Sequence, residues 1–288
     1  MVEVKAIACA LPARLGVPLA RLHVPDIAAE AVDRGIVASI SDATIWRWLS
    51  ADAIRPWAHR SWIFPRDPDF AAKAGRVLDL YHRRFGGRPL RPDEFVISAD
   101  EKTSIQARVR RHPSLPPGPG SPMLLEHEYE RAGALQYLAA FDVHRARLFG
   151  RCEPRTGIAP FGRLVDQVMR RAPYREARRV FWVTDNGSSH RGEASVRRLA
   201  ERHPNLVLVH LPVHASWLNQ IEIYFSIVQR KVLTPNDFAD LDEVAGRLLE
   251  FQKRYEEIAV PFEWTFTRRD LKRLLRRLDQ SAALQRAA

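Results

Sequence analysis

The order of apolar segments after Asp93 restricts the fold of this chain more than any other feature of its sequence. Phe95–Ala99 is an apolar run, apolar and polar residues alternate from Ile105 to Val109, and Leu135–Val143 is another extended stretch. Alternating helical and extended segments follow these three predicted strands: helices over 161–171, 193–203 and 216–232, and strands over 179–184 and 205–211. This order predicts an α/β fold, with a mixed sheet flanked by helices.

The first 60 residues have a different pattern, because helical signals occur at Val4–Leu11, Pro25–Arg34 and Asp42–Ala51. The second predicted helix ends at Gly35 and the third begins behind Ser41, a favourable N-cap residue, so only a short turn separates them. Two helices joined in this way predict a helix-turn-helix, and an ordinary helical hairpin is the alternative.

In a helix-turn-helix the second helix enters the major groove of DNA, so we predict that Thr44, Arg47 and Trp48 contact DNA. In the hairpin alternative, Trp46 and Trp48 belong to the core. The chain is thus expected to comprise a small helical helix-turn-helix domain (1–60), a connector with a linker helix (61–92) and a larger α/β domain with C-terminal helices (93–288).

The chain carries a strong positive charge: 45 Lys and Arg against 34 Asp and Glu give a formal net charge of +11. A polyanion is therefore the favoured partner, with DNA, RNA and an anionic membrane surface as alternatives. No apolar run approaches the ~20 residues of a spanning helix, so we expect a soluble cytoplasmic protein with no membrane partner. Cys9 and Cys152 lie far apart, which argues against a disulfide framework and a structural zinc site.

Three acidic residues occupy positions suited to catalysis. Asp100 follows the first predicted strand and Asp185 follows the strand over 179–184, and the carboxyl ends of strands border the ligand crevice of open α/β sheets. Glu222 lies at the edge of the apolar face of the predicted helix 216–232, from which it can point toward those strand ends. Ordinary solvated acids at strand ends and helix starts are the alternative.

Three carboxylates brought together would repel one another, by about 4 kcal/mol per pair at ~4 Å and an effective dielectric of ~20. Raised pKa values or bound cations can offset this repulsion. An all-oxygen site suits Mg²⁺, with Mn²⁺ as a substitute, and two ions ~3.5–4 Å apart promote in-line displacement at phosphorus. We therefore predict that Asp100, Asp185 and Glu222 are catalytic residues and ligands of two Mg²⁺ ions.

The sequence around these acids resembles the catalytic blocks of bacterial insertion-sequence transposases of the Tc/mariner superfamily. Asp185 and Glu222 are separated by 36 residues, close to the mid-thirties interval of that superfamily. The resemblance covers about Asp93–Leu275, and Trp46–Leu49 resembles the family's DNA-binding region. It is carried by the segments Ile97–Lys102 (ISADEK), Val183–His190 (VTDNGSSH), His214–Glu222 (HASWLNQIE) and Pro261–Thr267 (PFEWTFT).

The resemblance implies an RNase H-like catalytic core, in which Asp100 and Asp185 bridge or flank two metal ions and Glu222 completes the second site. Polar family positions beside the acids are matched by Asn186, His190 and Asn219, which could orient a carboxylate, a water or a phosphate. Turn and cap chemistry is the alternative for each of them. Family members usually carry a further helix-turn-helix ahead of this one, so we expect the N-terminal domain to be shortened.

Basic residues near the early strands are candidates for binding substrate DNA close to the metals. We predict that Lys102, Arg108 and Arg110 contact phosphates, each adding about 0.9 to the salt slope of duplex binding. A predicted amphipathic helix at the end of the chain is also basic, but a solvated charged face is the favoured explanation there. Its basic residues are Arg268, Arg269, Lys272, Arg273, Arg276 and Arg277.

The principal functional hypothesis is a Mg²⁺-dependent DNA transposase, which hydrolyses phosphodiester bonds at element ends and transfers the freed 3′ hydroxyl into target DNA. A catalytically silent DNA-binding remnant that regulates a related element is the first alternative. An RNase H-like nuclease without strand transfer is the second. For the transposase we expect a homodimer, because two element ends must be paired, and double-stranded DNA as the partner, both terminal inverted repeats and target, in the bacterial nucleoid.

Overall fold

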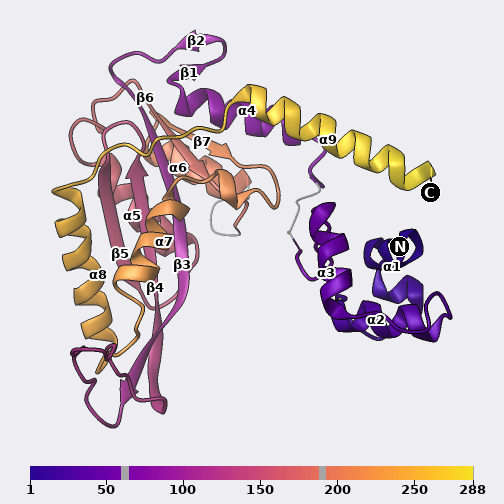
Figure 1. Cartoon of the computed structure of the whole chain (residues 1–288). Coiled ribbons are helices and arrows are strands. Elements are labelled where there is room, and N and C mark those ends of the chain that lie inside the picture. The colour runs from indigo at the N-terminus through magenta and orange to yellow at the C-terminus, as the bar shows by residue number, and fades with distance from the viewer. Residues whose placement is uncertain (60–64, 188–192, 288) are drawn as a thin grey trace. The chain divides into compact units, whose positions relative to one another are not determined.

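The computed structural model describes residues 1–59, 65–187 and 193–287, and its internal contacts divide the chain into two units, Met1–Phe64 and Pro65–Ala288 (Figure 1). Each unit has a hydrophobic core of its own. Among the residues that the structure describes, none of the helices is both long and apolar enough to cross a membrane.

The first unit is helical. Gly35 adopts φ +66° after the second helix, a left-handed conformation that glycine reaches without strain. Ser41 caps the third helix by accepting a hydrogen bond from the Thr44 amide at 3.3 Å, so the predicted helix pair and its turn are both present. The helices pack around fully buried Val4, Ile27, Ile45 and Leu49. The elements are α1 (Val2–Cys9), the 3-10 turn η1 (Pro12–Leu15), α2 (Val24–Asp33) and α3 (Asp42–Ala51).

A five-stranded mixed sheet forms the centre of the second unit, in the order β5-β4-β3-β6-β7. β3, β4 and β5 pair antiparallel, whereas β6 pairs parallel to both β3 and β7. The predicted mixed α/β sheet is therefore confirmed. Its strands are β3 (Glu94–Arg110), β4 (Tyr129–Asp142), β5 (Arg147–Glu153), β6 (Arg179–Thr184) and β7 (Leu206–His210).

The longest strand, β3, differs from the sequence prediction. The segments 95–99 and 105–109 were predicted as two strands, but they belong to one strand of 17 residues. Pairing with β4 runs through Lys102 and resumes at Ile105 after a register shift, and the intervening Ser104 has φ +57°. The third antiparallel strand is instead β5, which was not predicted because Gly150 and charged residues weaken its β pattern.

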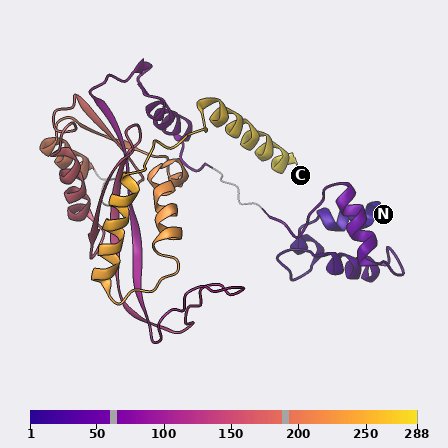
Figure 2. The same cartoon turned by 60° about the vertical axis from the view of Figure 1, so that its left-hand side comes forward.

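Helices cover both faces of the sheet (Figures 1 and 2). α5 (Ile158–Met169) and α6 (Glu193–Arg202) cover one face, and α7 (Ile221–Lys231) and α8 (Leu241–Glu256) cover the other. Side chains of a strand alternate between the faces. Ile97 and Ala99 pack with the α5 cluster and Val96 with the α7 cluster, so Asp100, which is in phase with Val96, belongs to the face covered by α7.

The segment before the sheet also belongs to the second unit. α4 (Phe70–Tyr81) packs into the core on the α7 side and is followed by a short hairpin, β1 (Arg84–Phe85) and β2 (Arg88–Pro89). The remaining elements are the 3-10 turn η2 (Ser216–Leu218) and α9 (Arg268–Ala287), which packs on α4. Of the segment 61–92, predicted as a connector with a linker helix, residues 65–92 are thus grouped with the sheet.

Candidate active site

Asp100 on β3 and Asp185 just after β6 lie at the same level of the sheet. The parallel pairing of β3 and β6 ends at Ser98 opposite Val183, and the two aspartates come two residues later on each chain. Asp185 lies just beyond β6, where its Oδ1 accepts a hydrogen bond from the Gly187 amide at 2.8 Å. Asp100 does not end its strand as predicted, because β3 continues beyond the point where β6 stops.

A buried pair of polar side chains joins β3 to the start of α7. Ser98 Oγ donates to Asn219 Oδ1 and accepts a hydrogen bond from the Ile221 amide at 2.9 Å. Asn219 Nδ2 donates to Asp100 Oδ2 and to the Ala99 carbonyl, both at 3.1 Å. Ser98 and Asn219 are almost fully buried, and hydrogen bonds shielded from water are stronger than exposed ones. This network orients the Asp100 carboxylate and fixes the first residue of α7.

Glu222 follows directly as the second residue of α7 and is half-buried. Burial raises its pKa, the neighbouring Lys102 ammonium lowers it, and the Asp185 carboxylate raises it. The Glu222 side chain therefore lies within electrostatic reach of both Asp185 and Lys102.

The Asp100 carboxyl group is strongly perturbed. Burial, together with the charges of Asp185 and Glu222, raises its pKa to about 7. The Glu101 amide, which donates to Asp100 Oδ1 at 2.8 Å, acts in the opposite direction. The three carboxylates predicted from the sequence are therefore brought together as an interacting cluster. Buried like charges of this kind are typical of functional sites.

The carboxylates interact electrostatically, but their oxygens do not surround a common metal position. Within the described ranges, no three His, Cys, Asp or Glu side chains are close enough to hold a metal ion together. The donor atoms of the three carboxylates are all oxygens, the ligands that hard divalent cations prefer. A cation placed among them would relieve the repulsion that raises the pKa values of Asp100 and Glu222. The chemistry of the donor set thus fits Mg²⁺ or Mn²⁺.

The other predicted supporting residues have different outcomes. Asn219 contacts Asp100 directly. The side-chain Nδ2 of Asn186 donates instead to the Leu211 carbonyl at 2.7 Å, and this bond links the ends of β6 and β7. His190 lies outside the described residues.

The basic residues predicted to meet phosphates are separated along β3. Lys102 is next to Glu222. Arg108 stacks on the ring of Tyr129, with its guanidinium carbon 4.6 Å from the ring centroid, and its buried Nε has no hydrogen-bond partner. Arg110 is committed to the protein itself, because its guanidinium donates to the carbonyl oxygens of Glu126, His127 and Asn236. Of the three, Arg110 is therefore the one whose guanidinium is engaged by carbonyl groups of the protein.

The residues predicted to contact DNA in the first unit all lie on α3. Arg47 is exposed, whereas Thr44 and Trp48 are half-buried. The Thr44 hydroxyl lies 2.9 Å from the Ser41 hydroxyl in the helix cap, and Trp48 packs against the helical core. Arg47 is consequently the most accessible of the three predicted contacts.

Residues that support the site from a distance were not predicted. Ser98 lies inside the apolar run Phe95–Ala99, where its polarity was the only sign of a role beyond packing. The Tyr81 hydroxyl donates to the Leu218 carbonyl at 2.8 Å, and Asp67 Oδ2 accepts from the Val213 amide at 3.0 Å. Both contacts hold the chain between β7 and α7, and they join segments too far apart in the sequence to leave a local pattern.

Comparisons with known proteins agree with this fold. The chain is similar to the Mos1 strand transfer complex, with a TM-score of 0.52 at 12% identity, covering 98% of this chain and 76% of that chain. It is also similar to the Mos1 transposase paired-end complex with left transposon end, with a TM-score of 0.50 at 13% identity, covering 98% and 77%. A search of curated proteins finds no significant match. The predicted RNase H-like fold is confirmed.

The family comparison reaches the site itself. Residues 96–245 match the family described as DDE superfamily endonuclease, and this segment contains Asp100, Asp185 and Glu222. The predicted resemblance to Tc/mariner transposases is confirmed at the level of this superfamily and of the fold. Because the matched segment is more than half of the chain, the protein belongs to the DDE superfamily of endonucleases.

Proposed function

We propose that this chain is a DNA transposase, which hydrolyses phosphodiester bonds at the ends of a mobile element and joins the freed 3′ hydroxyl to target DNA. One observation carries the proposal: the Asp185 carboxylate raises the pKa values of both Asp100 and Glu222, so three acids interact where β6 ends beside β3. Membership of an endonuclease superfamily and a fold shared with Mos1 transposase support the same reaction.

Asp100, Asp185 and Glu222 are proposed to hold two Mg²⁺ ions, for which Mn²⁺ can substitute. Such ions, when bound, activate an attacking oxygen and stabilise the leaving oxygen of an in-line displacement at phosphorus. The cations would also offset the repulsion between the three carboxylates and an anionic phosphodiester.

The chain's own residues prepare this site. Asn219 orients the Asp100 carboxylate through its amide, and Ser98 anchors the α7 terminus that presents Glu222. Lys102 places a positive charge beside Glu222, where the substrate would bring negative charge. Catalysis requires groups that are already held in position, so we include this hydrogen-bond network in the proposed active site.

The first unit is proposed to be a helix-turn-helix domain that recognises the terminal inverted repeats through α3, with exposed Arg47 as a contact. The net charge of +11 supports a polyanionic partner. The similar Mos1 structures include a paired-end complex, and by analogy we propose a homodimer that pairs two element ends on cytoplasmic DNA.

The test is incubation of the purified chain with Mg²⁺ and labelled duplexes that carry the inverted repeats flanking its gene. Cleavage followed by joining to a second DNA is the expected result. Cleavage without joining would replace the transposase with a nuclease. Binding without cleavage, in Mg²⁺ and in Mn²⁺, would leave a DNA-binding regulator.

A further inference from the structure

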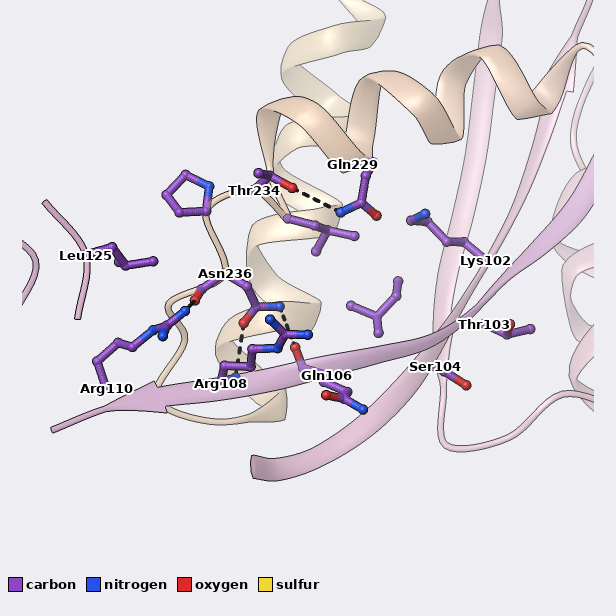
Figure 3. Close-up of a pocket in the computed structure, with 13 residues that line it drawn as sticks. Lys102, Thr103, Ser104, Gln106, Arg108, Arg110, Leu125, Gln229, Thr234 and Asn236 are labelled. Atoms are coloured by element: carbon purple, nitrogen blue, oxygen red, sulfur yellow. Dashed lines mark hydrogen bonds between the residues drawn. The ribbon is translucent and has the colours of Figure 1, made fainter. Parts of the chain in front are cut away.

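A polar pocket of about 530 Å³ opens along the distal half of β3 (Figure 3). One wall is the strand itself from Lys102 to Arg110, and the other is the end of α7 with the segment that follows it. Figure 3 shows Lys102 and Gln229 reaching toward the pocket from the strand and the helix. Residues that line it from the second wall are Gln229, Leu233, Thr234, Pro235 and Asn236.

The charged residues that line this pocket are all basic. Lys102, Arg108 and Arg110 line it, and its described lining residues include no Asp or Glu. Two polar atoms of the lining, Gln106 Oε1 and Arg108 Nε, are buried without a hydrogen-bond partner. Arg108 Nε carries an N–H donor, which an anionic oxygen could accept from, whereas Gln106 Oε1 is itself an acceptor and calls for a donor. The basic lining residues favour an anionic ligand.

The pocket lies beside the active site, because Lys102 lines it and also interacts with Glu222. β3 carries Asp100 and then Lys102, and α7 carries Glu222 and then Gln229. Gln229 lies seven positions after Glu222 along the helix, about 10 Å at ~1.5 Å per residue. A ligand that extends from the carboxylates along both elements would therefore reach the pocket.

The far end of the pocket is held rigidly. The Asn236 side chain accepts a hydrogen bond from the Arg108 amide at 3.1 Å and donates to the Gln106 carbonyl at 2.8 Å. The Asn236 carbonyl accepts from the Arg110 guanidinium at 3.0 Å. These bonds tie the segment after α7 to the edge of β3, so the wall is formed before any ligand binds. A preformed wall lowers the entropy lost on binding.

We propose that this pocket binds the sugar-phosphate backbone of the DNA strand that is cut, with one phosphate at Lys102 and a more distant one at Arg108. The proposal rests on the proposed function, because it takes the cleaved strand as the ligand that leads away from Asp100 and Glu222. Contacts to the backbone are independent of base sequence, so the pocket positions the strand without selecting it.

Arg108→Gln tests the pocket through the salt dependence of binding. The probe is a fluorescent 30-base-pair duplex of random sequence, titrated with the full chain in EDTA at several NaCl concentrations. Losing one phosphate contact should reduce the slope of log K against log salt by about 0.9, which corresponds to about eightfold weaker binding at 0.1 M. Arg108→Lys, which keeps the charge, should retain the slope.

Two further variants keep the test decisive. Arg175→Gln removes the same charge from an exposed position outside the pocket and should leave the slope unchanged. Gln229→Glu adds a carboxylate at an exposed position of the pocket wall, so it should fold normally and bind the duplex several-fold more weakly. Slopes and affinities equal to wild type in both Arg108→Gln and Gln229→Glu would overturn the inference.

Mg²⁺-dependent cleavage by the wild-type chain is measured in parallel. If wild type cleaves element ends while the pocket variants bind like wild type, the pocket inference fails and the proposed function stands. If wild type never cleaves DNA but Arg108→Gln lowers the slope, the proposed function fails, and with it the assignment of the bound strand as the one that is cut.

Discussion

At the scale of single residues, Asp185 gives the sharpest test of the carboxylate cluster, because its charge acts on both other members. Asp185→Asn keeps the shape of the side chain and removes the charge. Loss of a group that only orients a metal ligand costs 10–100-fold, so loss of a ligand should lower the cleavage rate by more than about 100-fold. The affinity for DNA should change little.

The matched control is Asp242→Asn, an exposed aspartate in the first turn of α8, which should cleave at the wild-type rate. Cleavage rates on labelled duplex and affinities by fluorescence anisotropy check both expectations. Undiminished cleavage by Asp185→Asn would remove the central assignment of this site.

Asp100 gives a prediction about pH. Burial, with the Asp185 charge, raises its pKa from the ordinary 3.8 to about 7. Between these values the folded protein holds a proton that the unfolded chain releases, so this group lowers the free energy of unfolding as pH rises from about 4 to 7. Bound Mg²⁺ favours the charged carboxylates, so it should stabilise the protein at pH 8 much more than at pH 5.5.

Thermal unfolding with and without Mg²⁺ measures this effect. At an ion concentration 100 times Kd the expected stabilisation at pH 8 is about 2.7 kcal/mol, a rise in Tm of roughly 5–10 °C. Asp185→Asn should lose most of the rise. Equal rises at the two pH values would contradict the coupling between cation binding and carboxylate charge.

At the scale of elements, the junction between β3 and α7 depends on Ser98. Ser98→Ala leaves the buried Asn219 Oδ1 and the Ile221 amide without their partner, and each unsatisfied group costs about 1–3 kcal/mol. The free energy of unfolding should fall by that order. Cleavage should also fall, by roughly 10–100-fold, because Asp100 and Glu222 lose their support.

Ser226→Ala is the control for the stability measurement. Ser226 is exposed on α7 and its hydroxyl donates only to the Glu222 carbonyl of the same helix, at 2.9 Å. Its loss should change the free energy of unfolding by less than about 0.5 kcal/mol. Denaturant titration distinguishes the two variants, and equal stabilities would show that the junction is not held by Ser98.

The same junction shows what local sequence can and cannot predict. Glu222 was found because a polar stripe beside an apolar one is a local, periodic signal. β3 was divided in two because its polar residues from Asp100 to Ser104 interrupt the apolar pattern, although β4 pairs with most of this stretch. Ser98 and Tyr81 were missed because their partners lie more than 100 residues away, where periodicity carries no information.

At the scale of the whole molecule, the two units have separate cores, built from residues 4–57 and from residue 70 onward. We therefore expect a fragment comprising 65–288 to remain folded and to cleave DNA with Mg²⁺. Specific DNA-binding proteins prefer their sites by about 10³-fold or more. The fragment should lose most of any such preference for the element ends.

Competition binding between element ends and random duplex measures this preference. Arg47→Ala in the full chain should reduce it in the same direction without changing the cleavage rate on random DNA. A fragment that still prefers the element ends would place their recognition in the second unit rather than on α3.

The length of β3 has a consequence for where the DNA is cut. Asp100 and Arg108 stand on one strand, eight residues and at most about 26 Å apart. If Arg108 binds one phosphate and cleavage occurs near Asp100, the length of β3 between them fixes the distance from the bound phosphate to the cut. The enzyme would then cut at a constant offset from the gripped phosphate, whatever bases lie between.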